Sequence, residues 1–462
     1  MFAPVRSVHF IGIAGTAMAS AAAAMQERGF SITGSDQNIY PPMSGFLAAR
    51  GIAVSTPYHA DNLSHHPDLV VVGNAISRGN PEAEAVLDQR LRYCSLPELL
   101  KEFFIRGRRS LVVSGTHGKT TTTSLLAWTL QHAGLDPSFL IGGIPRNLQQ
   151  GARFTHSEWF VIEGDEYDTA FFDKRSKFVH YLPELVVMNN LEFDHADIFP
   201  SLQDIQLAFR RLAVLVPRNG LLLANGDDPN LAPVLADAPC PVLTFGLGSA
   251  NAVRAENLAL LPDRSLFSVG DVQFQIPLTG EFNVRNAMAV VAAARRCNIP
   301  DDAVQAAFDS FLGIARRMDV RGIAGGVTVV DDFAHHPTAL RETLRALRIR
   351  FPGQRLWAVF EPRSNTTRRN VFQSDLAEAL SLSDRVVVAM VARMDLLKPE
   401  ERLDPARLIR DIEAANVPAA YLPDAPAIVS HVAHLARPGD VVCVFSNGSF
   451  DDLHGRLLRT LG

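Results

Sequence analysis

The chain has 462 residues, too many for one ordinary domain, and 47% of them are hydrophobic, enough for several packed cores. Its 44 lysines and arginines stand against 49 aspartates and glutamates, a net charge of −5 that does not favour nucleic acid or an anionic membrane as partner. The few, widely spaced cysteines show no metal-binding pattern and favour reduced thiols. We therefore expect a cytoplasmic protein without membrane insertion and without an obligate protein partner.

One stretch leaves export open as an alternative. Residues 7–26 carry no charge and follow Arg6, as in the core of a signal peptide. Against this, alanine rather than leucine dominates the stretch, and Gly12 and Gly15 interrupt it. No other segment resembles a membrane span.

The first βαβ unit has a glycine-rich turn. Residues 5–11 read as a strand, Gly12-Ile13-Ala14-Gly15 as the turn, residues 16–28 as a helix, and residues 29–33 as a second strand that leads to Asp36. An acidic residue at that distance is placed to hold a ribose hydroxyl. The fingerprint is imperfect, so an NAD site, another nucleotide site and a purely structural turn all remain open.

A further apolar strand, residues 68–72, ends before Asn74-Ala75-Ile76. Open α/β sheets bind ligands at the carboxyl ends of their strands. We therefore expect Asn74, Ala75 and Ile76 to line the same site as Gly12.

The centre of the chain is the segment LVVSGTHGKTTTTSLL, residues 111–126. An apolar strand stops at a glycine turn and a helix follows, which is the arrangement that binds phosphate through backbone N–H groups. Lys119 is placed to reach the β- and γ-phosphates, and the Thr120 hydroxyl to ligate Mg²⁺. The turn is shorter than the usual P-loop, because Val113 stands where that loop has a glycine. The expected phosphate-binding residues are Gly115, Thr116, His117, Gly118, Lys119, Thr120 and Thr121.

Two strand ends near this loop carry metal-ligand chemistry. Residues 159–162 run into Glu163-Gly164-Asp165-Glu166, and Glu163, the first acid after the strand, is the expected Mg²⁺ ligand. The strand at residues 185–188 leads to His195, which is either a ligand of a second metal ion or a solvent-facing loop histidine.

Polar residues continue at later helix starts and strand ends. Asn283 and Asn286 open a helix, where they serve as caps or contact a nucleotide base. The glycine- and arginine-rich segment 313–326 looks like a hinge into a third domain. Three strands of that domain end in polar clusters: Asp331 to His335, Arg363-Ser364-Asn365, and Ser446-Asn447.

Alternating strands and helices predict an α/β protein with mostly parallel sheets. We expect three domains: a Rossmann-like domain at residues 1–107, a P-loop ATPase-type domain at 108–317, and a Rossmann-like domain at 318–462.

The motifs GTHGKT, NNLEFDH, NVRNA and DDFAHHP occur in this order, and the chain resembles the Mur ligase family over its whole length. The resemblance implies ATP-dependent amide formation through an acyl phosphate, in bacterial cell-wall synthesis. Five stretches favour a member that joins UDP-N-acetylmuramate to the murein tripeptide L-Ala-γ-D-Glu-meso-diaminopimelate in peptidoglycan recycling: GSDQNIYPPMS, GNAISRGNPE, EGDEYDTAFFDKRSKFVHY, FEPRSNT and FSNGSF. A ligase that adds L-alanine to the same nucleotide is the alternative.

The resemblance also implies residue roles. Lys119, Glu163 and His195 would be catalytic, with Thr120 and Glu163 as ligands of one Mg²⁺ and His195 as a ligand of a second metal ion. The implied ATP contacts beyond the phosphate loop are Asn283, Asn286, Arg317, Asp331 and His335. The implied UDP-sugar contacts are Gly12, Ile13, Ala14, Gly15, Asp36, Asn74, Ala75, Ile76 and His117. The implied peptide contacts are Arg363, Ser364, Asn365, Ser446 and Asn447.

Some positions depart from the family pattern. Many Mur ligases have a carbamylated lysine that supports the second metal, yet no lysine occurs between His195 and Pro217. Phe282 stands where a histidine is common, and Asp319 where glutamate is common.

Three other classes compete. A folylpolyglutamate-synthase-like ligase leaves the unit from Gly12 to Asp36 unused. An NAD-dependent oxidoreductase leaves GTHGKT and Glu163 unexplained, and a non-catalytic P-loop switch leaves the third domain without a role.

Overall fold

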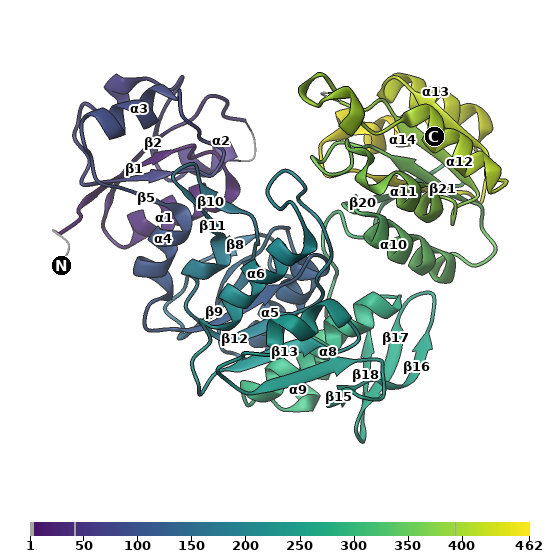
Figure 1. The fold of residues 1–462 in the computed structure, drawn as a ribbon, viewed down its shortest axis with the longest axis horizontal. Helices are drawn as coiled ribbons and strands as arrows, with labels where there is room; N and C mark the ends of the chain where they lie inside the picture. Colours follow the sequence, from purple (N-terminus) through teal and green to yellow (C-terminus); the bar gives the residue numbers. More distant parts are fainter. Residues whose placement is uncertain (1–3, 41–42, 393) are drawn as a thin grey trace.

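The computed structural model describes residues 4–40, 43–392 and 394–462, and it consists of three α/β units along the chain (Figure 1). The predicted class, three α/β domains with mostly parallel sheets, is confirmed. No helix among the described residues combines the length and the apolar character needed to cross a membrane.

The first unit is a five-stranded parallel sheet in the order β3-β2-β1-β4-β5. The expected βαβ unit is present, with the helix starting directly after the glycine turn. The elements are β1 (Ser7–Ile11), α1 (Thr16–Glu27), β2 (Ser31–Ser35), α2 (Met43–Ala48), β3 (Ala53–Ser55), β4 (Leu69–Val72), α3 (Pro81–Asp88), β5 (Tyr93–Ser95) and α4 (Leu96–Leu100).

The central unit is an eight-stranded sheet in the order β15-β14-β13-β12-β6-β9-β7-β8, in which only the pair β7–β8 is antiparallel. Helices α5 and α8 pack against each other beside it. Its main elements are β6 (Arg109–Ser114), α5 (Lys119–His132), β7 (Ser138–Leu140), β8 (Ala152–Arg153), β9 (Trp159–Gly164), β12 (Pro183–Met188), α6 (Leu202–Ala213), β13 (Leu221–Asn225), β14 (Val242–Gly246), β15 (Val253–Arg254), α8 (Glu281–Arg296) and α9 (Asp301–Asp309).

Two small antiparallel sheets, which the sequence patterns did not predict, accompany the central unit. One is the hairpin of β10 (Asp168–Ala170) and β11 (Asp173–Ser176); the other joins β16 (Glu256–Leu260), β17 (Ser265–Val269) and β18 (Val272–Ile276).

The third unit is a six-stranded sheet in the order β19-β20-β24-β21-β22-β23, with only β19 antiparallel. Within the expected hinge at 313–326, residues 319–324 form strand β19, which pairs with β20 and so belongs to the sheet of the third unit. The elements are β19 (Asp319–Ala324), β20 (Val327–Asp332), α10 (Pro337–Arg350), β21 (Leu356–Phe360), α11 (Gln373–Leu380), β22 (Arg385–Ala389), α12 (Pro405–Ala414), β23 (Ala419–Leu422), α13 (Ala425–Leu435), β24 (Val441–Phe445) and α14 (Leu453–Leu461).

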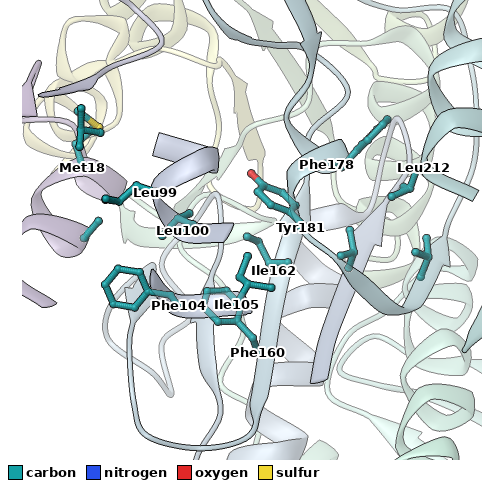
Figure 2. Packing of buried hydrophobic residues seen from close by; sticks show 14 of the residues in the cluster. Met18, Leu99, Leu100, Phe104, Ile105, Phe160, Ile162, Phe178, Tyr181 and Leu212 are labelled. Carbon is teal, nitrogen blue, oxygen red and sulfur yellow. The ribbon is translucent and has the colours of Figure 1, made fainter. Parts of the chain in front are cut away.

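The first two units share one hydrophobic core, whereas the third has separate cores. Figure 2 shows residues of the shared cluster: Met18 and Leu99 come from α1 and α4, Phe104 from the connecting segment at residues 101–108, and Phe160 and Ile162 from β9. A further contact comes from Phe172 in the β10–β11 turn. Its ring packs edge-on against Tyr93 of the first unit, with the ring centroids 4.8 Å apart. Continuous apolar burial therefore joins the first and central units more firmly than it joins either to the third.

Candidate active site

One cavity of about 1760 Å³ is lined by all three units. Its wall includes the glycine turn after β1, the loop between β6 and α5, the end of β9, the start of α8, and the segment after β20. Because β1, β4, β6, β9 and β20 end at this cavity, the strand-end clusters found in the sequence meet in one place.

The loop between β6 and α5 requires its glycines. Gly118 has φ +77°, and a Cβ there would lie 2.5 Å from Asn286 Oδ1. Beneath the loop, Thr122 Oγ1 donates to Asn286 Oδ1 (3.1 Å) and Asn189 Nδ2 donates to Thr122 Oγ1 (2.9 Å). Asn286 therefore supports the loop from helix α8, and Asn283 donates to the Thr279 carbonyl at 2.9 Å. Both asparagines also line the cavity.

Lys119 opens helix α5, and its amine points back to the loop. Lys119 Nζ donates to the carbonyls of Gly115 (2.6 Å) and Thr116 (3.4 Å), and lies 3.0 Å from Glu166 Oε2. Burial lowers the pKa of Lys119, but the carboxylates of Glu166, Asp165 and Glu163 outweigh burial and raise it overall. The site therefore holds a charged amine where a phosphate would lie.

Glu163 ends strand β9 beside Thr120. Thr120 Oγ1 donates to Glu163 Oε1 (3.0 Å), the Gly142 N–H donates to Glu163 Oε2 (2.7 Å), and Arg317 Nη2 donates to Thr120 Oγ1 (3.2 Å). Burial, and then the nearby Asp165, raise the pKa of Glu163. A buried carboxylate destabilised in this way, beside a hydroxyl, suits a hard cation such as Mg²⁺.

His195 lies next to Glu166 rather than next to Glu163. Its Nε2 is 3.1 Å from Glu166 Oε1. Burial lowers the pKa of His195, but the hydrogen bond and charge of Glu166 raise it overall. Glu166 was not among the predicted site residues, although it follows the same strand end as Glu163; the strand-end pattern identified the cluster but could not rank its acids.

Three side chains of types that can bind a metal ion, His117, Glu192 and His336, meet where the third unit contacts the phosphate loop. His117 Nε2 and His336 Nδ1 lie 3.3 and 3.4 Å from Glu192 Oε2. Thr338 donates from Oγ1 to Glu192 (2.7 Å) and from N–H to His336 Nδ1 (3.2 Å), while His336 Nε2 donates to the Phe193 carbonyl (3.1 Å). Because the Nδ1 lone pair is engaged, this cluster is a hydrogen-bonded link between units rather than a cation site. Apart from His117, these residues were not predicted.

The structure separates two neighbouring acids of the third unit. Asp331 pairs with Arg316 and Arg321, each at 3.5 Å, and with His454 at 3.2 Å, and it does not line the cavity. Its neighbour Asp332 does line it, since successive strand residues face opposite sides of a sheet. Asp331 is therefore not brought together with the other predicted ATP contacts, whereas Arg317 and His335 are.

The predicted UDP-sugar residues divide in the same way. Gly12, Gly15, Asp36, Asn74, Ala75, Ile76 and His117 line the cavity. Ile13 and Ala14 do not line it, and the Ile13 side chain is fully buried in the core. Asp36 accepts the Ala14 N–H (2.9 Å) and the Tyr58 hydroxyl (3.3 Å), so its carboxylate braces the glycine turn. Asn74 Nδ2 donates to the Asp168 carbonyl (2.8 Å) and so ties β4 to the β10–β11 hairpin.

A second cavity of about 380 Å³ adjoins His195 and His335. Four of the five predicted peptide residues line it: Arg363, Ser364, Asn365 and Asn447. Ser446 is instead fully buried, and its hydroxyl donates to Glu361. Asn365 Nδ2 donates to Asp197 (2.7 Å) across the gap between the third and central units.

Comparisons with known proteins agree with this architecture. Three family patterns match the chain: "Mur ligase family, catalytic domain" at residues 7–108, "Mur ligase middle domain" at 113–294, and "Mur ligase, glutamate ligase domain" at 316–448. The chain is 42% identical to the UDP-N-acetylmuramate–L-alanyl-γ-D-glutamyl-meso-2,6-diaminoheptandioate ligase of Escherichia coli, covering 98% of both chains.

A second sequence relative and a solved structure also match over nearly the whole chain. A UDP-N-acetylmuramate–L-alanine ligase of Variovorax paradoxus is 32% identical, covering 98% of this chain and 95% of its own. The crystal structure of a murein peptide ligase from Psychrobacter arcticus matches with a TM-score of 0.73 and 36% identity, covering 99% of each chain. By sequence and by structure along its whole length, this chain belongs to the Mur ligase family.

Proposed function

We propose that the chain is an ADP-forming ligase that joins UDP-N-acetylmuramate to the tripeptide L-Ala-γ-D-Glu-meso-diaminopimelate in peptidoglycan recycling. The observation that carries the proposal is the single cavity, which connects the glycine turn of the first unit, the phosphate loop and the strand ends of the third unit. ATP, UDP-N-acetylmuramate and the tripeptide must react with one another, so the ligase needs one space that all three substrates can reach. Full-length identity is 42% to a tripeptide ligase and 32% to an L-alanine ligase, which supports the tripeptide as acceptor.

The reaction has two balanced steps. A lactyl carboxylate oxygen of UDP-N-acetylmuramate attacks the γ-phosphorus of ATP, and ADP leaves, which gives an acyl phosphate. The peptide amine then attacks the acyl carbon, loses a proton, and expels phosphate as the amide bond forms. Since charge and alignment dominate such barriers, the main requirement is a set of fixed cations around the phosphates.

The chain supplies those cations on both sides of the cavity. Lys119 would stabilise the transferring phosphoryl group from the loop, and Arg317 would approach it from the junction with the third unit. Mg²⁺, when bound, would neutralise phosphate charge; Thr120 and Glu163 would hold one ion and His195 a second. The remaining proposed ATP contacts are Gly115, Thr116, Gly118, Thr121, Asn283, Asn286 and His335.

The other substrates would lie on either side. UDP would occupy the cleft at Gly12, Asp36 and Asn74, within the proposed domain 1–107, next to the ATP-binding domain 108–317. The peptide would enter through the smaller cavity of domain 318–462, where Arg363 suits its carboxylates. Because the reaction consumes ATP and a nucleotide sugar, we propose that the protein acts in the cytoplasm.

The test is ADP release with UDP-N-acetylmuramate, ATP and Mg²⁺, with either the tripeptide or L-alanine as acceptor. We expect turnover with the tripeptide and only background with L-alanine. Turnover with L-alanine alone would replace the proposed acceptor, and silence with both acceptors, despite ATP binding measured by calorimetry, would overturn the ligase proposal.

A further inference from the structure

Glu166 lies between Lys119 and His195, two residues of the candidate site. Its side chain is 3% exposed, and its carboxylate contacts Lys119 Nζ at 3.0 Å and His195 Nε2 at 3.1 Å. Lys119 is a cation, and His195 Nε2 lies within hydrogen-bonding distance of the carboxylate. Glu166 is therefore a buried anion whose direct ionic partners, among the described residues, are Lys119 and His195.

Lys119 Nζ lies 3.3 and 3.0 Å from the two carboxylate oxygens of Glu166, so both oxygens face this amine. The other polar contacts of Lys119 Nζ among described residues are the carbonyls of Gly115 and Thr116, which do not fix the charge of a flexible amine by themselves. Glu166 thus determines where the Lys119 charge lies at the mouth of the loop.

The His195 side of the contact is equally specific. His195 has φ +52°, and its backbone N–H donates to Asp194 Oδ1 at 2.7 Å. The backbone is therefore fixed locally, while the ring is oriented by Glu166. Residues 196–216 contain no lysine, so the carbamylated lysine of many Mur ligases has no source there, and the carboxylate in contact with the His195 ring is that of Glu166.

We propose that Glu166 is a positioning residue for phosphoryl transfer, which fixes Lys119 on the phosphate side and His195 on the metal side of the site. The inference rests on the proposed ligase function. Glu166 acts through its two partners: it aligns the amine that would meet the phosphoryl group and the imidazole that would meet a metal.

The test uses Glu166→Gln, which keeps the shape and removes the charge, and Glu166→Asp, which keeps the charge and shortens the reach. Glu184→Gln is the matched control, because Glu184 pairs with Arg109 at the opposite end of the same sheet. We would measure kcat, the KM of each substrate, and Mn²⁺ binding to the complex with a non-hydrolysable ATP analogue by electron paramagnetic resonance.

For Glu166→Gln we expect kcat to fall about 100-fold, with the KM of UDP-N-acetylmuramate unchanged within about twofold. Mn²⁺ affinity should fall about tenfold, as for other residues that orient a metal ligand. Glu166→Asp should lie between wild type and Glu166→Gln in both quantities, and Glu184→Gln should match wild type.

Wild-type kcat and Mn²⁺ affinity in Glu166→Gln would overturn the proposal. A general defect, in which kcat falls, the KM of every substrate rises and the melting temperature drops together, would also overturn it. If Glu166→Gln does not fold, Glu166→Asp decides: a selective loss of kcat supports the proposal and a wild-type kcat overturns it. The Mn²⁺ titration needs no turnover, so it tests Glu166 even if the wild-type protein fails to ligate the tripeptide.

Discussion

Replacing Lys119 by alanine should abolish ligation while leaving the UDP-sugar site nearly intact. The amine sits in a pocket where its side chain is 12% exposed, so solvent screens its charge only weakly. Two unit charges about 4 Å apart interact by about 4 kcal/mol at an effective dielectric constant of about 20. If that energy is realised in the transition state, its loss lowers kcat by about 10³-fold.

The same substitution also affects stability. Glu166 loses its closest cation but keeps His195, so we expect a cost of about 1–3 kcal/mol in the free energy of unfolding, less than for a fully unpaired buried charge. The fold should survive, because the shared hydrophobic core of the first and central units is untouched. Thermal unfolding followed by circular dichroism measures this cost.

The assay combines ADP release with calorimetric titration of UDP-N-acetylmuramate. The dissociation constant of the nucleotide sugar should stay within about twofold of wild type, since Lys119 and the glycine turn at Gly12 belong to different sheets. Lys101→Ala, which removes a lysine from the connecting segment, is the control and should retain wild-type activity. Retention of more than a tenth of the activity in Lys119→Ala, or a parallel loss of nucleotide-sugar binding in a folded protein, would refute the reasoning.

Three further predictions concern the loop, the hairpin and the missing lysine. Gly118→Ala should abolish ATP binding measured by calorimetry, because the new Cβ would lie 2.5 Å from Asn286 Oδ1 in a left-handed backbone region; a wild-type affinity would contradict this. The pKa of Asp173 is lowered to about 2, chiefly by its hydrogen bond to Arg175, so Asp173 stabilises the fold fully above pH about 4 and loses that contribution as the pH falls towards 2. Asp173→Asn should thus cost up to about 2 kcal/mol of unfolding free energy at pH 7 and progressively less towards pH 2, measured by urea unfolding; a pH-independent difference would be evidence against the ion pair. Removal of CO₂ and bicarbonate from the assay should leave kcat unchanged, because residues 196–216 offer no lysine to carbamylate; a loss restored by bicarbonate would show that another lysine takes that role.

Local sequence patterns were sufficient for the fold class and for the position of the phosphate loop. A strand, a glycine turn and a lysine–threonine pair at a helix start lie within a few residues of each other, so adjacent backbone geometry determines them. The same holds for the glycine turn after β1. The clustering of polar residues at strand ends also followed from the chain alone, because parallel strands place their carboxyl ends on one edge.

The sequence did not determine which member of each cluster faces the cavity. Asp331 and Asp332 are adjacent, yet only Asp332 lines it, and Ile13 of the glycine turn packs into the core. Such choices depend on the side of the sheet that each residue faces, and on what a neighbouring unit covers. Ser446 is likewise turned away by its hydrogen bond to Glu361.

Contacts between distant segments were decided by tertiary structure alone. Thr338 and Glu192 are 146 positions apart, and Glu166 meets Lys119 across 47 positions. No periodicity connects such residues, because their pairing depends on how two strand ends and two units approach each other in space. The sequence therefore determined the kind of chemistry at each strand end, whereas the packing of the three units decided which groups share a proton, a charge or a metal.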